Sequence, residues 1–253
     1  MSRASSVALA SSPAKPVKPA TPIKATPSTT SRKTKARVAL VPRHDKRPHE
    51  VRIIGGQWKR TRLAVADLPG LRPTPDRVRE TLFNWLASLA GAGGGDLPGW
   101  HCLDAFAGTG ALGFEAASRG AAAVLMCEQE AVLVDKLKAT QAKLGANAVR
   151  IERGHGVSAL ERAVQGSLHA VFLDPPFEQP ALYEPALKAA ARALRADGVV
   201  YLEAARLWDE ADLAALGLTP FRHLKAGSVH AHLFQVASAA ANPPGSPLPS
   251  ESE

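Results

Sequence analysis

Five short apolar runs, each followed by a longer stretch with helical spacing, constrain the fold of this chain most strongly. The apolar runs are 100–106, 123–127, 148–152, 170–173 and 198–203, and the helical stretches are 111–119, 131–144, 157–165, 181–194 and 210–216. Alternation of this kind predicts an α/β fold with a Rossmann-like, mostly parallel sheet covered by helices on both faces. Two further runs, 221–225 and 229–236, flank Ala226-Gly227-Ser228 and predict a C-terminal antiparallel hairpin.

The basic charge of the chain is concentrated at its front. Residues 1–50 carry a net charge of +9, residues 51–90 carry +4 and residues 91–253 carry −5. Phosphate contacts supply most sequence-independent affinity for nucleic acid, so this asymmetry favours RNA or DNA binding by the front of the chain. A solvated basic tail without a specific role is the alternative interpretation for residues 1–47.

Composition divides the chain into four parts. Residues 1–47 are rich in Ser, Thr, Ala, Pro and Lys without an apolar period, so we expect a disordered basic tail. Their proline density argues against the amphipathic helix of an organellar transit peptide. We expect an N-terminal arm and helix over 48–98, a cofactor-binding domain over 99–237 and a second tail over 238–253.

Apolar runs and cysteines favour a cytoplasmic protein. No apolar stretch approaches the roughly 20 residues that span a bilayer, so we expect a soluble protein without a membrane partner. Cys102 and Cys127 fall inside apolar runs, which predicts buried free thiols in a reducing compartment. We see no His/Cys/Asp cluster with ligand spacing, and we expect no metal.

A glycine-rich loop follows the first apolar run. Gly108-Thr109-Gly110-Ala111-Leu112-Gly113 matches the dinucleotide fingerprint, and Glu128 follows about 20 residues after it. An NAD site is therefore one interpretation. Asp104 lies directly before the loop, where a carboxylate repels a pyrophosphate but attracts the ammonium group of S-adenosylmethionine (SAM). We therefore favour SAM as the cofactor, while Glu128 fits ribose hydroxyls in either case.

The tetrapeptide Asp174-Pro175-Pro176-Phe177 follows the apolar run 170–173. Two successive prolines fix the backbone and remove two N–H donors, so the carbonyl groups there point outward without competition. A carboxylate, a free carbonyl and an aromatic ring at one strand end suit a flat, amino-bearing base. A Pro-Pro turn capped by an aspartate is the alternative.

A helix is predicted to begin near Pro75. Thr74 is a suitable N-cap, Pro75 suits the first helical position, and an apolar stripe follows at Val78, Leu82, Trp85, Leu86 and Leu89. Thr74 and Arg77 are candidates to receive the carboxylate of the cofactor's amino-acid tail. An ordinary cap and a surface arginine remain the alternative.

Segment 53–63 predicts a small hairpin or extended arm with a turn at Gly55-Gly56. Trp58 lies among Lys59, Arg60 and Arg62, and a stacking ring between cations is what an unpaired RNA strand needs. We call Lys59, Arg60 and Arg62 the hairpin cations. The alternative is a basic surface turn with Trp58 folded onto the domain.

Four motifs resemble the RsmD family, in the same order and spacing, over about residues 50–237. They are Ile53-Ile54-Gly55-Gly56-Gln57-Trp58, Leu71-Arg72-Pro73-Thr74 with 76–86, 103–113 and Asp174-Pro175-Pro176-Phe177. The resemblance implies a class I methyltransferase fold. It also implies SAM-dependent methylation of the exocyclic N2 of a guanine in bacterial 16S ribosomal RNA.

The resemblance also assigns roles to single positions. It implies that Asp104, Phe106, Gly108 and Gly110 surround the methionine and ribose parts of SAM, that Glu128 takes the ribose hydroxyls, and that Gln129 lies beside the adenine. His155 and Gly156 stand where many related enzymes have an acidic residue against the adenine amine. Asp174, Pro175, Pro176 and Phe177 match the target-base motif, with direct methyl transfer as the expected mechanism.

Other functions stay open at this point. The same motif suits another planar nitrogen, such as adenine N6 in DNA or RNA or a protein glutamine amide. A third possibility is an RNA-binding assembly factor without activity. For the favoured function, the expected partner is 16S rRNA within a small-subunit assembly particle, and the expected state is a monomer.

Overall fold

The computed structural model describes residues 51–65, 74–91 and 95–237. The predicted tails, 1–47 and 238–253, lie outside the described residues, as does Leu71-Arg72-Pro73 of the second motif.

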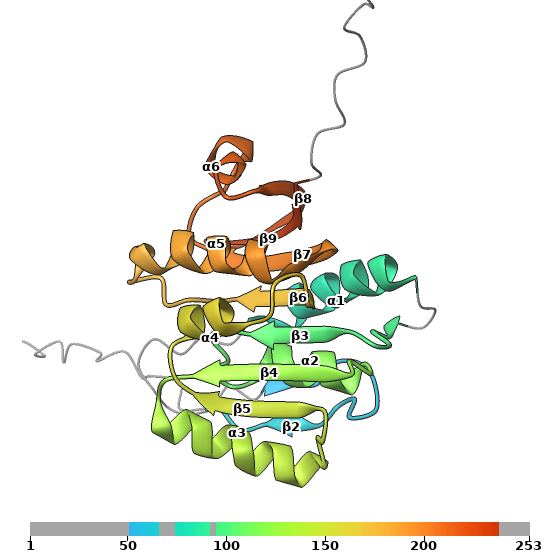
Figure 1. The fold of residues 1–253 in the computed structure, drawn as a ribbon. Helices are drawn as coiled ribbons and strands as arrows, with labels where there is room; N and C mark the ends of the chain where they lie inside the picture. The colour runs from blue at the N-terminus through green and yellow to red at the C-terminus, as the bar shows by residue number, and fades with distance from the viewer. Residues whose placement is uncertain (1–50, 66–73, 92–94, 238–253) are drawn as a thin grey trace, which may run out of the picture. The chain divides into compact units, whose positions relative to one another are not determined.

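A seven-stranded sheet forms the centre of the described domain (Figure 1). Its strand order is β5-β4-β3-β6-β7-β9-β8, and all neighbours are parallel except those that involve β9. The strands are β3 (His101–Asp104), β4 (Ala123–Glu128), β5 (Val149–Arg153), β6 (Leu168–Leu173), β7 (Leu194–Ala204), β8 (Leu218–Ala226) and β9 (Val229–Val236). The predicted parallel sheet and its C-terminal hairpin are confirmed.

Helices cover both faces of this sheet and enclose two hydrophobic clusters. Buried side chains of α1 (Asp76–Ala90), α2 (Ala111–Ser118) and α3 (Ala131–Leu144) belong to the cluster on one face. Those of α4 (Gly156–Arg162), α5 (Tyr183–Ala193) and α6 (Glu210–Ala214) belong to the other. The carboxyl ends of the parallel strands therefore open between two helical layers, where ligands bind in open α/β sheets.

Element boundaries differ from the predictions where local chemistry outweighs the apolar pattern. The predicted helix 181–194 begins as a short 3-10 turn, η2 (Pro180–Leu182), and ends at Ala193 because Leu194 already pairs with Leu168. β8 begins at Leu218, before the apolar run, and includes Pro220. β8 is an edge strand, where a missing N–H donor is tolerated.

The predicted N-terminal hairpin is confirmed as a two-stranded sheet of β1 (Val51–Arg52) and β2 (Arg62–Leu63). Its turn lies so close to the end of α2 that a Cβ on Gly56 would be 1.8 Å from the Ser118 carbonyl oxygen. Gln57 N donates to the same oxygen at 2.8 Å. Only glycine fits this contact, because Gly56 also has a φ of +71°.

A buried ionic network ties the hairpin to α1 and α2. Glu115 is fully buried and accepts hydrogen bonds from Ile54 N at 2.7 Å, from Gly55 N at 2.8 Å and from Arg119 Nε at 2.8 Å. Arg79, also fully buried, lies 3.7 Å from Glu115 and donates to Asp76 and to the carbonyl oxygens of Thr74 and Arg52. The hairpin is thus fixed to the domain by backbone donors on a buried carboxylate.

Cys102 and Cys127 are free and buried, as predicted, and burial raises the pKa of the Cys102 thiol to about 12. Among the described ranges, none of the helices combines the length and the apolar character needed to cross a bilayer.

Candidate active site

The glycine loop is organised by Asp104, which ends β3 and is 1% exposed. Its Oδ2 accepts a hydrogen bond from Gly113 N at 3.0 Å, in the first turn of α2. Asp104 therefore caps the helix N-terminus that a pyrophosphate would need. Gly110 N donates to the Ala107 carbonyl at 2.6 Å, so this donor also stays within the loop. These contacts argue against the dinucleotide interpretation.

Glu128, at the end of β4, fixes the other side of the loop. Its Oε2 accepts from Gly108 N at 2.8 Å, and its Oε1 accepts from Gln129 N at 2.7 Å and from Glu130 N at 2.9 Å. A carboxylate offers about four acceptor positions, so Oε2 retains one for another donor. That position is suited to a hydroxyl group such as those of a ribose.

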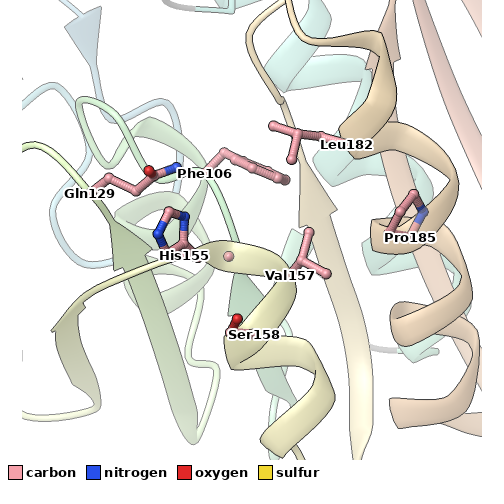
Figure 2. A pocket seen from close by; sticks show the side chains of 8 residues that line it. Phe106, Gln129, His155, Val157, Ser158, Leu182 and Pro185 are labelled. Carbon is pink, nitrogen blue, oxygen red and sulfur yellow. The ribbon is translucent and has the colours of Figure 1, made fainter.

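A cavity of about 300 Å³ opens beside this loop. Gln129 and His155 lie on one side of it and Leu182 and Pro185 on the other, with Phe106 between them (Figure 2). Gly156, Val157 and Ser158 at the start of α4 complete the lining. The structure brings the predicted residues Phe106, Gln129 and His155 together here with Gly156, the expected neighbour of His155. Four further lining residues were not predicted: Leu182, Pro185, Val157 and Ser158.

Gly156 shapes the floor of this cavity. A Cβ at this position would lie 2.0 Å from the carbonyl oxygen of Ala105, the residue after β3, so α4 begins this close to the glycine loop only because residue 156 is glycine. His155, directly before it, is exposed. The adenine contact of His155 stays a prediction.

The Asp-Pro-Pro-Phe motif begins immediately after β6, which is paired with β3 on one side and with β7 on the other. Asp174 is half-buried, Pro175 is buried and Phe177 is 42% exposed. No donor in the described part of the chain hydrogen-bonds to the Asp174 carboxylate. The motif therefore presents an available acceptor and an exposed ring.

Sequence reasoning missed Glu203, a buried carboxylate near the end of β7. It is 4% exposed, and its Oε1 accepts from Thr74 Oγ1 at 2.5 Å and from Tyr201 Oη at 2.9 Å. The signal was present, because Glu203 is a carboxylate at the end of the apolar run 198–203, and Asp174 likewise directly follows the run 170–173. Three strand-end carboxyl groups therefore meet at one edge of the sheet.

Burial raises the pKa values of all three carboxyl groups. It raises the pKa of Asp104 to about 7, against the effect of the Gly113 N–H donor. Burial also raises the pKa of Asp174 well above its usual value, and the carboxylates of Glu203 and Asp104 raise it further. For Glu203, burial raises the pKa, whereas the two hydroxyl donors and the charge of Arg79 lower it. Perturbed acids in one place are typical of functional sites.

The predicted helix start is wrong in detail. α1 begins at Asp76 with Pro75 at the N-cap position, and no side chain caps it. The Thr74 hydroxyl instead donates to the buried carboxylate of Glu203. Arg77 is exposed on the first turn, and its role toward a cofactor stays a prediction. The predicted apolar stripe of α1 packs into the core, as expected.

The hairpin presents its three cations at the surface, because Lys59, Arg60 and Arg62 are all exposed. Trp58 is half-buried and packs against the hydrophobic cluster that contains α1 and α2. The alternative interpretation therefore holds in part: this ring supports the hairpin on the domain, and only its remaining exposed part is available for stacking.

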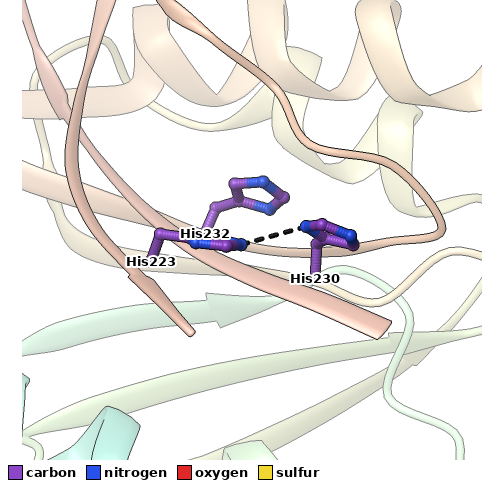
Figure 3. Close-up of side chains that lie close together, drawn as sticks. All are labelled: His223, His230 and His232. Carbon is purple, nitrogen blue, oxygen red and sulfur yellow. Dashed lines mark hydrogen bonds between the residues drawn. The ribbon is translucent and has the colours of Figure 1, made fainter. Parts of the chain in front are cut away.

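Three histidines on the β8–β9 hairpin lie close together, a cluster that sequence reasoning missed (Figure 3). His223 Nε2 and His230 Nδ1 are 3.0 Å apart. His232 Nε2 accepts from Trp208 N at 3.1 Å, and the other ring nitrogen faces the Leu202 carbonyl at 3.4 Å. A neutral imidazole has only one lone pair, so His232 cannot bind a metal without losing the bond to Trp208. We therefore assign this ring to the packing of β9.

Comparison with known proteins identifies the family. The family model described as Conserved hypothetical protein 95, which represents the RsmD family, matches residues 51–235. The chain belongs to the RsmD family.

The names of similar proteins support the membership of this chain in the RsmD family. The ribosomal RNA small subunit methyltransferase D of Escherichia coli (strain K12) is 46% identical over 136 residues, which are 53% of this chain and 64% of that protein. The protein of the same name from Haemophilus influenzae is 42% identical over 134 residues, with 51% and 64% covered. The match therefore spans slightly less than two thirds of each of these relatives.

Solved structures extend the agreement to the fold. A putative methyltransferase from Escherichia coli is similar with a TM-score of 0.60 and 34% identity, over 75% of this chain and 99% of that one. The fold of this RsmD-family chain is the class I methyltransferase fold, with the mostly parallel sheet and C-terminal antiparallel hairpin described above.

Proposed function

We propose that this protein uses SAM to methylate the exocyclic N2 of a guanine in bacterial 16S ribosomal RNA. The observation that carries the proposal is the available carboxylate of Asp174, which lies directly after a strand that pairs with the strand of the glycine loop. The names of the E. coli and H. influenzae relatives support small-subunit rRNA as the substrate.

The residues around the glycine loop fit SAM. Asp104 and Glu128 offer acceptors and negative charge, whereas most of the loop's N–H groups are already bonded within the protein. Such a site suits a cation with hydroxyl groups better than a pyrophosphate. We assign the methionine and ribose parts to Asp104, Phe106, Gly108 and Gly110, the ribose hydroxyls to Glu128, and the adenine to Gln129 and His155. SAM supplies a methyl group activated by its sulfonium.

Asp174 and Pro175 hold the target amine in this proposal. The N2 lone pair of guanine is delocalised into the ring, so it is a poor nucleophile. Hydrogen bonds from its two N–H groups to the Asp174 carboxylate and the Pro175 carbonyl favour a pyramidal nitrogen with a directed lone pair. Pro176 has no N–H donor that could compete for these acceptors. The exposed ring of Phe177 stacks on the flipped base.

Asp174 is also suited to take the proton that the methylated amine loses. General-base catalysis is most efficient when the pKa of the base lies near the working pH. Burial and two neighbouring carboxylates raise the pKa of Asp174 in that direction. The carboxylate then transfers the proton to water, without a covalent intermediate on the protein.

The hairpin cations provide the RNA-docking surface in this proposal. They are exposed, and the buried network around Glu115 holds their hairpin on the domain. Residues 91–253 carry a net charge of −5, which repels phosphate and leaves the basic front as the favoured contact. We further propose that the protein acts as a monomer in the cytoplasm, on rRNA within a small-subunit assembly particle.

Labelled methyl transfer tests the proposed function. Purified protein with methyl-labelled SAM is incubated separately with small ribosomal subunits, deproteinised 16S rRNA, genomic DNA and cell protein. We expect label in the ribosomal RNA, and comparison of subunit with naked RNA identifies the preferred substrate. Label confined to DNA or protein would contradict the rRNA assignment, and label in no fraction would indicate a factor without activity.

A further inference from the structure

Three carboxyl groups lie near the carboxyl ends of three adjacent strands, Asp174 and Glu203 at matched positions and Asp104 opposite Phe172, two positions before Asp174. Asp104 ends β3, Asp174 follows β6 directly, and Glu203 is near the end of β7. The last residue pair in the β6–β7 register is Leu173 with Leu202, so Asp174 and Glu203 are the next residues on two parallel neighbours. Side chains at matched positions of parallel strands point to the same face. We call these three residues the carboxyl cluster.

Little positive charge neutralises the carboxyl cluster. Within the described ranges, none of its members takes part in an ion pair. Arg79 acts on Glu203 through space, but its guanidinium donates to Asp76 and to the carbonyl oxygens of Thr74 and Arg52. Glu203 itself receives only neutral hydroxyl donors.

Other titratable groups facing the cluster add negative charge or none. Glu128 on β4 acts on Asp104 and raises its pKa. Tyr201 on β7 and Tyr183 on α5 have raised pKa values through burial and through these carboxylates, so both phenols stay neutral. Glu178, after β6, acts on Tyr183 in the same sense. Buried acids that cannot all ionise together retain protons near neutral pH.

We propose that Glu203 makes cofactor binding proton-linked: the carboxyl cluster holds a proton in the free protein and releases it to solvent when a cationic methyl donor binds. This inference rests on the proposed use of SAM. SAM carries a positive sulfonium, whereas S-adenosylhomocysteine, the product after transfer, has a neutral thioether at the same place. A positive charge near the cluster stabilises its ionised form, and a neutral sulfur does not. Glu203 is a positioning residue in this scheme, because it acts through the charge of Asp174.

Proton linkage predicts different pH dependences for the two ligands. When one proton is released on binding, the association constant rises up to tenfold per pH unit below the cluster's pKa and becomes constant above it. SAM should follow this curve between pH 6 and 9. S-adenosylhomocysteine should bind with an affinity that changes less than about twofold over the same range. At high pH, where SAM binds most tightly, S-adenosylhomocysteine is therefore released more readily than SAM.

Titration calorimetry of the full-length protein counts the protons directly. SAM and S-adenosylhomocysteine are each titrated at pH 7 in phosphate and in Tris, whose enthalpies of ionisation differ strongly. We expect the SAM enthalpy to depend on the buffer with a slope that corresponds to proton release. The S-adenosylhomocysteine enthalpy should show little buffer dependence.

Glu203→Gln tests the residue itself, because the amide keeps the shape and its oxygen still accepts from Thr74 and Tyr201. Removing one acid lets Asp174 ionise more easily, so we expect fewer protons released and a pH curve shifted to lower pH. Glu184→Gln, an exposed position on α5, is the matched control and should behave as wild type. A purely structural role would weaken both ligands equally and leave the proton count unchanged.

The outcomes separate this inference from the proposed function. Equal proton release with both ligands, or an unchanged count in Glu203→Gln, would overturn the inference while leaving methyl transfer to rRNA intact. Failure of the wild type to bind SAM would overturn both. SAM binding with the expected proton release but no transfer to rRNA would contradict the proposed substrate alone.

Discussion

Replacing Glu115 with alanine should detach the basic hairpin from the domain. Glu115 accepts two backbone N–H groups of the hairpin, from Ile54 and Gly55, and the Nε–H of Arg119. The substitution leaves these donors without a partner and removes the carboxylate that pairs with the buried Arg119 at 2.8 Å, whereas Arg79 keeps its ion pair with Asp76. Breaking a buried ion pair by removing one partner costs about 3–5 kcal/mol, because an uncompensated charge stays inside.

Urea unfolding monitored by tryptophan fluorescence measures this loss. With a denaturant slope of about 2 kcal/mol per molar urea, the midpoint should fall by about 2 M. Glu161→Gln removes an exposed carboxylate on α4 and should change the free energy of unfolding by less than about 0.5 kcal/mol. If Glu115→Ala is too unstable to purify, Glu115→Gln gives a milder form. A loss below about 1 kcal/mol for Glu115→Ala would refute the role of this network.

Three further substitutions test the cofactor site and the RNA surface. Glu128→Ala should weaken SAM binding about 10- to 150-fold in calorimetry, because a charged hydrogen bond to the ribose contributes about 1.5–3 kcal/mol; unchanged affinity would contradict the assignment. Gly156→Ala should lower the free energy of unfolding by about 1–3 kcal/mol in urea, because its Cβ meets the Ala105 carbonyl at 2.0 Å. Gly154→Ala, with no atom within 4 Å of the added Cβ, is its control. Replacing the three hairpin cations by alanine should weaken RNA binding in filter assays and lower its log–log salt slope by roughly 0.7–0.9 per lost phosphate contact. This triple substitution should leave SAM affinity unchanged. If replacing three lysines of α3 by alanine weakened RNA binding equally, the hairpin would not be the specific RNA contact.

The sequence predicts the sheet well because its signals are local. Each strand of a parallel sheet buried on both faces is an apolar run, and each crossover helix is long enough to show its own period. Both strands of the predicted C-terminal hairpin are present for the same reason. Asp104 and Asp174 could be placed at one edge because carboxyl ends of parallel strands meet there.

Long-range partners explain what the sequence did not predict. Thr74 has the chemistry of an N-cap, but its hydroxyl donates to Glu203, which is 129 positions further along the chain. Nothing in the local sequence distinguishes Arg79 from the exposed charged residues of α1, yet its side chain is fully buried between the hairpin and α2. No local pattern distinguishes a guanidinium that packs under a distant turn from one that faces water. The role of Trp58 depends equally on the contact of its hairpin with α2.

Nucleoside analysis of 16S rRNA methylated by the wild type and by Asp174→Ala tests the central claim most directly. The rRNA is digested and its methylated nucleosides are separated by liquid chromatography and mass spectrometry, with SAM affinity measured in parallel. We expect N2-methylguanosine from the wild type. For Asp174→Ala, we expect less than about a tenth of that product with nearly unchanged SAM binding, because Asp174 acts on the base amine. Another methylated nucleoside from the wild type, or substantial transfer by Asp174→Ala, would contradict the account.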